Sequence, residues 1–198
     1  MAAKGHIDDI GVGLFSDLSI SNHNGTLVPA GMTRAALDAL FATEDTAAPF
    51  AAAANTFVRI KNIRDFPSMG TPPNIVKVPV YGAKQSMQIQ GQADAPSMEI
   101  TLNYIPNDWS ATALGAFLGD GLSRIFRFSL LTVDPGAGNY GYVTAGVTGI
   151  GSVKNSYYYW AGKMAALLVK PSLTDATTAT LTLSMSSDFY GAYTVLDV

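Results

Sequence analysis

The sequence contains no cysteine among its 198 residues, and only two histidines, His6 and His23. The absence of cysteine excludes disulfide scaffolds, zinc–thiolate sites and thiol nucleophiles. Both histidines lie near the N-terminus, where no carboxylate stands at a spacing typical of a metal site. The remaining chain offers no histidine that would act as a general base beside a serine. We therefore expect no metal, no cofactor and no enzymatic activity.

Charged residues are also scarce. They make up 14% of the chain, while 48% of the residues are hydrophobic; typical soluble domains carry about 25% charged residues. So few charges would not cover the surface of a free monomer. This favours a subunit that uses much of its surface in contacts. The 12 basic and 15 acidic residues give a net charge of −3, which argues against a strongly basic nucleic-acid binder.

Long apolar runs are missing as well. No stretch approaches the ~20 apolar residues that a membrane-spanning helix needs. Asp8 and Asp9 stand where a secretory signal peptide would carry its apolar segment. We expect a protein that is made and assembled in the cytoplasm and has no membrane anchor.

Two glycine-rich patterns and three carboxylates resemble functional motifs only in part. Gly11-Val-Gly13 lacks the third glycine of a dinucleotide-binding loop, and residues 136–141 lack the Lys-Ser/Thr of a phosphate-binding loop. Asp94, Glu99 and Asp108 would be candidates for an acid/base pair. We interpret Glu99 as part of a polar strand face and the other two as loop caps.

The N-terminal region differs from the rest. Residues 1–54 are rich in Ala, Gly, Asp and Ser. Residues 33–41 are predicted to form a helix whose N-cap is Thr33 and whose apolar face is Ala36, Leu37, Leu40 and Phe41. We interpret residues 1–54 as an arm or embellishment, and residues 55–198 as the main domain.

From residue 56 onward, apolar and polar residues alternate with a period of two, as in half-buried strands. The clearest segments are residues 58–61, 76–80, 97–104 and 178–185; weaker candidates are 124–131, 140–148 and 163–169. Pro79 suggests an edge position or a bulge. The apolar positions expected in the core include Val58, Ile60, Met98, Ile100, Leu102, Leu181 and Leu183. The alternate positions Glu99, Thr101 and Asn103 are expected on a polar sheet face.

One further helix is predicted at residues 109–118, with Leu114, Phe117 and Leu118 on its buried face and Asp108 or Ser110 as its cap. Many short strands and one or two short helices predict a mainly β fold, an antiparallel β-sandwich or barrel.

Aromatic and basic residues gather in two places. Residues 157–160 read Tyr-Tyr-Tyr-Trp, which would suit a base-stacking platform, although a packed strand or a subunit contact explains them better. Basic side chains are expected to face outward from neighbouring strands, as a solvated face or as partners of acids on another subunit: Arg59, Lys61, Arg64 and Lys77.

One stretch is more specific. An opening strand with Ile60-Lys-Asn-Ile63 is followed by a Gly/Pro turn and a second strand, then by Gly91-Gln-Ala-Asp94, and then by Met98-Glu-Ile-Thr-Leu-Asn-Tyr104. Over residues 56–108 this order resembles the tail tube (major tail) proteins of long-tailed bacteriophages. From residue 126 to 185 only the strand order and a closing alternating strand agree, and residues 1–54 depart from the family pattern.

The resemblance implies a structural subunit of the virion tail. Six copies would form a ring, rings would stack into a hollow tube, and the inner sheets of all subunits would join into one barrel around a channel for DNA. The partners would be further copies of the chain and other tail proteins (tape measure, tail-tip and terminator proteins). DNA would pass without specific binding, which suits a mildly acidic protein. Glu99, Thr101 and Asn103 are then candidates for the channel surface.

Residues 81–96 have few large apolar side chains, apart from Met87 and Ile89, which alternate with polar residues. The corresponding loop of the proteins that this sequence resembles orders against the neighbouring subunit. We therefore expect residues 81–96 to be mobile in a monomer and ordered in a ring. The predicted interface residues are Tyr81, Lys84, Met87, Ile89 and Asp94.

Other classes of protein also fit the pattern. One alternative is another virion or injection-system assembly protein, such as a capsid decoration protein or the tube of a contractile system. A carbohydrate-binding β-sandwich is a further alternative, and residues 157–160 are its one candidate for a sugar-stacking surface.

Overall fold

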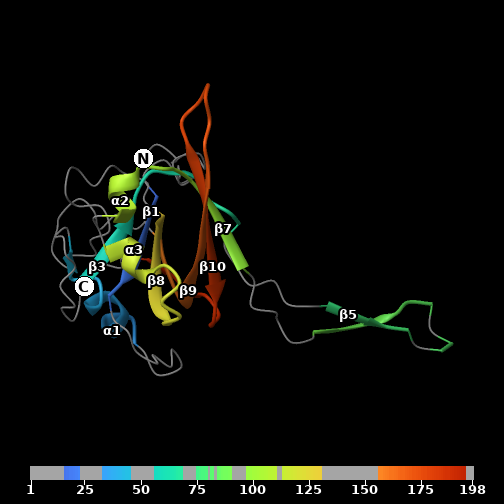
Figure 1. Cartoon of the computed structure of the whole chain (residues 1–198). Coiled ribbons are helices and arrows are strands. Elements are labelled where there is room, and N and C mark those ends of the chain that lie inside the picture. Colours follow the sequence, from blue (N-terminus) through green and yellow to red (C-terminus); the bar gives the residue numbers. More distant parts are fainter. Residues whose placement is uncertain are drawn as a thin grey trace, which may run out of the picture.

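The computed structural model describes residues 16–22, 33–45, 56–68, 75–79, 81–82, 84–90, 97–110, 113–130 and 156–194. These residues form a mainly β structure with three short helices (Figure 1). The strands are β1 (Asp17–Ser21), β2 (Thr43–Glu44), β3 (Thr56–Ile60), β4 (Ile63–Asp65), β5 (Ile75–Val78), β6 (Met87–Gln90), β7 (Ser97–Asn103), β8 (Arg124–Leu130), β9 (Ser156–Lys170), β10 (Thr178–Met185) and β11 (Tyr190–Thr194). The helices are α1 (Arg34–Ala39), α2 (Pro106–Ser110) and α3 (Ala113–Phe117).

Nine strands form one sheet with the order β2-β3-β1-β8-β9-β10-β7-β4, and β11 pairs with β9. All of these pairs are antiparallel except β2 with β3, which is parallel. β5 and β6 form a separate two-stranded sheet. Among the described strands no barrel closes, because the path of the large sheet ends at β2 on one side and at β4 on the other.

The long strand β9 divides the sheet into two parts. Residues 156–162 pair with β8 on one side, and residues 156–159 pair with β11 on the other; residues 162–170 pair with β10. We call β2, β3, β1, β8, β11 and the first part of β9 the β8 half. The β10 half comprises the second part of β9 with β10, β7 and β4.

Gly162 lies where β9 passes from one half to the other. It pairs with Arg124 of β8 and with Met185 of β10. A Cβ atom at this position would lie 2.7 Å from the backbone oxygen of Ser184. The close approach of the two backbones therefore requires a residue without a side chain.

The main core is shared by the two halves. A single cluster of buried side chains includes Leu18, Ile60 and Phe126 from the β8 half together with Ile100 and Leu181 from the β10 half. Side chains from the two halves of one continuous sheet therefore pack together in a single core. Helices α2 and α3 add Trp109, Leu114 and Phe117 to the same cluster. The seven core positions expected from the alternation are all buried: Val58, Ile60, Met98, Ile100, Leu102, Leu181 and Leu183.

A second cluster lies on the opposite face of the β8 half, beneath α1. Leu37, Leu40 and Phe41 of the helix region pack against Phe57, Ile125, Tyr157, Tyr159 and Ala161 of the strands. The β8 half is therefore covered on both faces, which explains why residues 124–129 of β8 are buried without interruption.

The described elements of the N-terminal region are packed into this fold. β1 lies between β3 and β8, and α1 covers the sheet next to it. The division expected after residue 54 therefore does not isolate β1 and α1 from the rest of the fold. The Thr33 side chain accepts a hydrogen bond from the Ala36 amide (3.3 Å) and caps α1, but Ala36 is exposed and does not belong to the buried face.

Several expected elements have different bounds in the structure. The helix expected at residues 109–118 is two short helices, α2 and α3, with Leu114 and Phe117 buried as expected. Asp108 lies within the first turn of α2 instead of capping a helix. The strand candidate at 163–169 and the aromatic residues 157–160 belong to the single strand β9. Pro79 follows β5 instead of interrupting it, and residues 140–148 lie outside the described residues.

Candidate assembly surfaces

The arm, which we define as β5, β6 and the turn between them, stands away from the rest of the molecule (Figure 1). Val78 pairs with Met87 and Lys77 with Gln88. Because cross-strand partners share a face, Val78, Met87 and Ile89 lie on one face, and Lys77 and Gln88 lie on the other. The arm therefore has one apolar face and one mainly polar face, which also carries the exposed Ile75, although β5 and β6 pair only with each other.

Nothing in the described part of the chain covers the apolar face of the arm. The exposed fractions of Met87 and Ile89 are 63% and 53%, and Tyr81 in the turn is fully exposed. An isolated two-stranded hairpin is marginally stable in water, and adjoining exposed apolar side chains mark interaction sites. Of the predicted interface residues, Tyr81, Lys84, Met87 and Ile89 all lie exposed on the arm; Asp94 lies outside the described residues.

The polar face of the β10 half carries the residues that the sequence placed there. Glu99 is exposed, Thr101 is half-buried and Asn103 is exposed, whereas the alternate residues of β7 are buried. The register sets them beside Thr182, Thr180 and Thr178 of β10. Hydroxyl groups therefore dominate the part of this surface formed by β7 and β10, and the exposed Leu168 of β9 lies beside Thr180 on the same face.

The ionised groups of this face balance each other. The register places Lys163 and Lys170 of β9 beside Ser184 and Thr178, and Asp65 of β4 beside Thr101. With Glu99, the described face has two acids and two lysines. The expectation that a mildly acidic protein repels DNA therefore finds no support in the charge of this face, which is neutral at pH 7.

The β10 half also has open lateral edges. Beyond Gly162, β9 pairs with β10 on one side, and the described residues provide no strand on its other side. At the opposite edge lies β4, which has only three residues and pairs with Thr101 and Leu102 of β7. Unpaired N–H and C=O groups at such edges are templates for pairing with another chain.

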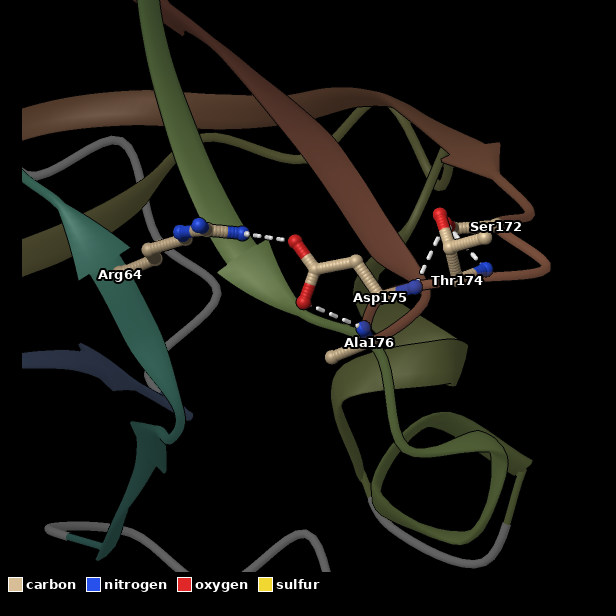
Figure 2. A network of polar contacts seen from close by, with 5 residues as sticks. All are labelled: Arg64, Ser172, Thr174, Asp175 and Ala176. Carbon is tan, nitrogen blue, oxygen red and sulfur yellow. Dashed lines mark hydrogen bonds and ion pairs between the residues drawn. The ribbon is translucent and has the colours of Figure 1, made fainter.

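The turn that joins β9 to β10 is a surface that the sequence analysis did not identify. The Ser172 hydroxyl accepts hydrogen bonds from the amides of Thr174 (3.4 Å) and Asp175 (3.0 Å), and an Asp175 carboxylate oxygen accepts one from the Ala176 amide (2.8 Å) (Figure 2). The other carboxylate oxygen lies 3.6 Å from Arg64 Nη1. Between these anchors Leu173 is fully exposed.

Polar groups on the second face of the β8 half are structural. Arg127 is fully buried, with its guanidinium 4.3 Å from the centre of the Phe41 ring. Burial lowers the pKa of this guanidinium and raises the pKa of the Asp17 carboxyl, although Arg59 and Arg127 act on Asp17 in the opposite direction. The Tyr159 hydroxyl donates a hydrogen bond to Asp38 of α1, and burial raises the pKa of that hydroxyl.

Three of the four aromatic residues of β9 are inside the protein, and the fourth, Tyr158, is half-buried. Tyr157, Tyr159 and Trp160 are buried, and Trp160 stacks on Phe126 with 5.6 Å between ring centres. Their rings are therefore not open to a base or a sugar, and they form a packed strand.

The basic residues that were expected on one face are dispersed. The Arg59 side chain binds Glu44 (2.9 Å), Arg64 lies near Asp175, and Lys77 lies on the arm. Arg59, Lys61 and Arg64 line a cleft at the corner of β3 and β4, but Asp17 and Asp65 line it too. This cleft has no strong charge of one sign.

Two kinds of feature are absent from the described residues. No helix there has the length and apolar character to cross a membrane, and no three His, Cys, Asp or Glu side chains there gather as metal ligands would. His6 and His23 lie outside the described residues. Comparison with models of known protein families and with curated protein sequences gives no match.

Proposed function

We propose that this protein is the structural subunit of a phage tail tube. Copies join side by side into a ring, which the resemblance suggests is hexameric, and rings stack around a channel for DNA. The tube belongs to the virion tail and is assembled in the host cytoplasm. The subunit performs no catalysis and needs no cofactor; its partners are its own copies and other tail proteins.

The observation that carries the proposal is the construction of the β10 half. Its apolar face lies on the core, and among the described residues nothing covers its polar face and no strand pairs with either of its lateral edges. It has four strands that alternate in direction, so its edge strands β9 and β4 run in opposite directions. When copies are arranged in a ring, β9 of one therefore meets β4 of the next in antiparallel orientation, and the four-stranded sheets continue into one another.

The uncovered polar face supports the channel. In a closed ring of such sheets, the faces with the apolar side chains stay on the subunit bodies, and the faces with Glu99, Thr101 and Asn103 turn toward the axis. Two acids offset the two lysines of this face, so it has no excess of positive charge with which to bind the phosphates of duplex DNA, and such phosphate contacts supply most of non-specific binding. This suits a channel through which DNA slides.

Hydrogen exchange tests the lateral contact. In a monomer, alternate amides of residues 163–170 point to the open edge of β9 and should exchange fast. In rings or tubes, which electron microscopy of concentrated protein should reveal, those amides should become protected. The amides of residues 126–129 in β8, which pairs there with β1 and with β9, are the matched control and should be protected in both states. Assemblies in which the edge amides of β9 still exchange fast would contradict this ring contact, and a monomer that never assembles would contradict the function.

A further inference from the structure

The part of β9 that can pair with another chain is short. At one end the Gly119 amide donates a hydrogen bond to the Met164 carbonyl oxygen (3.0 Å), so the segment before β8 already occupies the strand edge there. At the other end β9 stops at Lys170, and the next residue, Pro171, has no N–H group to offer a neighbouring strand. Among the described residues, the open edge of β9 is therefore residues 165–170.

The opposite edge of the β10 half, at β4, carries different side chains on its two faces. Ile63 lies opposite the fully buried Leu102 of β7, so it belongs to the face on the core. Asp65 is exposed on the polar face. The side chain of Arg64, which stands between them, lies 3.6 Å from the Asp175 carboxylate and is balanced by it (Figure 2). Asp65 is therefore the charge that β4 presents to a neighbouring strand on the polar face.

The open edge of β9 has the complementary pattern. The register with β10 places Val169 on the core face and Lys170 on the polar face. Val169 is 42% exposed although its face lies toward the core, and Lys170 is exposed. In the described part of the chain neither Lys170 nor Asp65 takes part in an ion pair. Each edge thus presents one apolar side chain and one charge, and the two charges have opposite signs.

The alternation of side chains limits how the two edges can join. Polar face must continue into polar face, because a slip of one residue would exchange the faces. With Ile63 of one copy opposite Val169 of the next, Asp65 lies diagonally across from Lys170; with a shift of two residues toward the end of β9, Asp65 lies directly opposite Lys170. A lysine side chain can span both separations. A shift of two residues in the other direction places Asp65 against Ala166 instead.

We propose that Asp65 of one copy forms an ion pair with Lys170 of the next copy, and that this pair selects the alignment of β4 with β9. This inference rests on the proposed function and names the side chains that set the register of its lateral contact. The partner is a second copy because one chain carries both charges, on opposite edges of the same four-stranded sheet. An exposed ion pair adds little affinity, so its contribution is specificity, since alignments that separate the two charges leave both unpaired.

Charge reversal tests the pair. Asp65→Lys should leave the monomer folded, because Asp65 is exposed, and should raise the concentration at which rings form about tenfold or more, since like charges then meet at every junction. Lys170→Asp should have the same effect. Glu99→Lys on β7 and Lys163→Asp on β9 are the matched controls: they change the charge of the same face away from the junction and should form rings as the wild type does. Circular dichroism verifies folding, and sedimentation with electron microscopy measures ring formation.

Combining the two reversals separates a contact between copies from other effects of charge. A chain with both Asp65→Lys and Lys170→Asp carries the pair in reverse and should form rings at the wild-type concentration. A mixture of the two single variants, with different affinity tags, should co-assemble, because opposite charges then meet only between one variant and the other. A double variant as defective as the single ones, or single variants that do not co-assemble although the double variant does, would overturn the proposal.

Ionic strength gives an independent measurement. Because salt screens exposed charges, the difference in ring formation between Asp65→Lys and the wild type should shrink as salt is added, and a difference that salt does not change would count against the ion pair. Wild-type rings together with single variants that assemble normally would overturn the ion pair and leave the proposed function standing. Wild-type protein that forms no ring overturns the function itself.

Discussion

The two halves of the sheet share one core but differ in what covers them. The β8 half is enclosed by the main core on one face and by α1 on the other. The β10 half is enclosed on one face, and its burial alternates residue by residue along β10. One continuous sheet thus provides a half that is buried on both faces and a half that is buried on one face only. In the part of the chain that the structure describes, the open strand edges and the uncovered polar face therefore lie together, in the β10 half.

A charged substitution on the buried face of the β10 half should have the largest effect on stability. Ile100→Asp places a carboxylate at a fully buried position, which costs several kcal/mol, so no soluble folded protein is expected. Glu99→Gln, one residue along on the bare face, should leave the melting temperature nearly unchanged. Thermal melts by circular dichroism compare the two variants, and greater damage from Glu99→Gln would show that the two faces are assigned in reverse.

The junction between the halves should be the next most sensitive place. Gly162→Ala should destabilise the fold by about 1–3 kcal/mol, because the new methyl group meets the Ser184 carbonyl oxygen and the strands must shift. Chemical denaturation measures this difference. Ala165→Ser, at an exposed position of the same strand, is the control and should stay within about 0.5 kcal/mol. A Gly162→Ala protein as stable as the wild type would mean that the two backbones do not approach this closely.

Residues on the uncovered polar face of the β10 half should become less accessible to bulky reagents when a tube assembles. A substitution there should leave the stability of the subunit unchanged. Thr182→Cys gives the chain a single thiol beside Glu99, on the face that we place in the channel. In a monomer, small and bulky maleimides should both react with it. In an assembled tube the bulky reagent should react much more slowly than the small one. Unchanged reaction with the bulky reagent in tubes would place this face on the outside.

The smallest effect on stability should come from Asp17, which lies on the second face of the β8 half. Burial raises the pKa of Asp17 in the folded state, so the folded protein binds this proton more tightly than the unfolded chain does. Between the usual carboxyl pKa and this raised value, the free energy of unfolding should therefore fall as pH rises. Asp17→Asn should flatten that dependence and should not destabilise the protein at neutral pH. Denaturation across this pH range is the measurement, and a slope that survives in Asp17→Asn would assign it to another group.

The sequence predicted the β10 half better than the β8 half, because only the β10 half has one face in contact with water. β7 and β10 alternate strictly because water contacts every second residue, and this made Ile100 and Glu99 easy to assign. In β8 both faces are buried, so Phe126 and Arg127 give no period of two. β1 was missed because Asp17 and Ser19, polar residues that usually indicate a loop, are buried beside charged partners that are distant in sequence.

The assembly surfaces were predicted only in part. The alternation around Met87 and Ile89 indicated a strand without a core of its own, which matches β6 on the arm. Leu173 gave no signal, because a single leucine in a turn has no periodicity, and its exposure depends on how Ser172 and Asp175 fold the backbone. The open edge of β9 could not be read from the sequence either, since it depends on where β8 begins, at Arg124.

The number of strands in the β10 half has a consequence for symmetry. Four is an even number, so in the proposed ring every junction between copies would have the same antiparallel form as the pairs within a copy, and no junction would be parallel. This holds for five, six or seven copies alike. Backbone pairing therefore permits any ring size, and the size must be set by the curvature of each sheet. The crossing at Gly162 and the register shift between Thr182 and Leu183 are local sources of such bending, so substitutions there are the ones expected to change the diameter of a tube while its wall stays continuous.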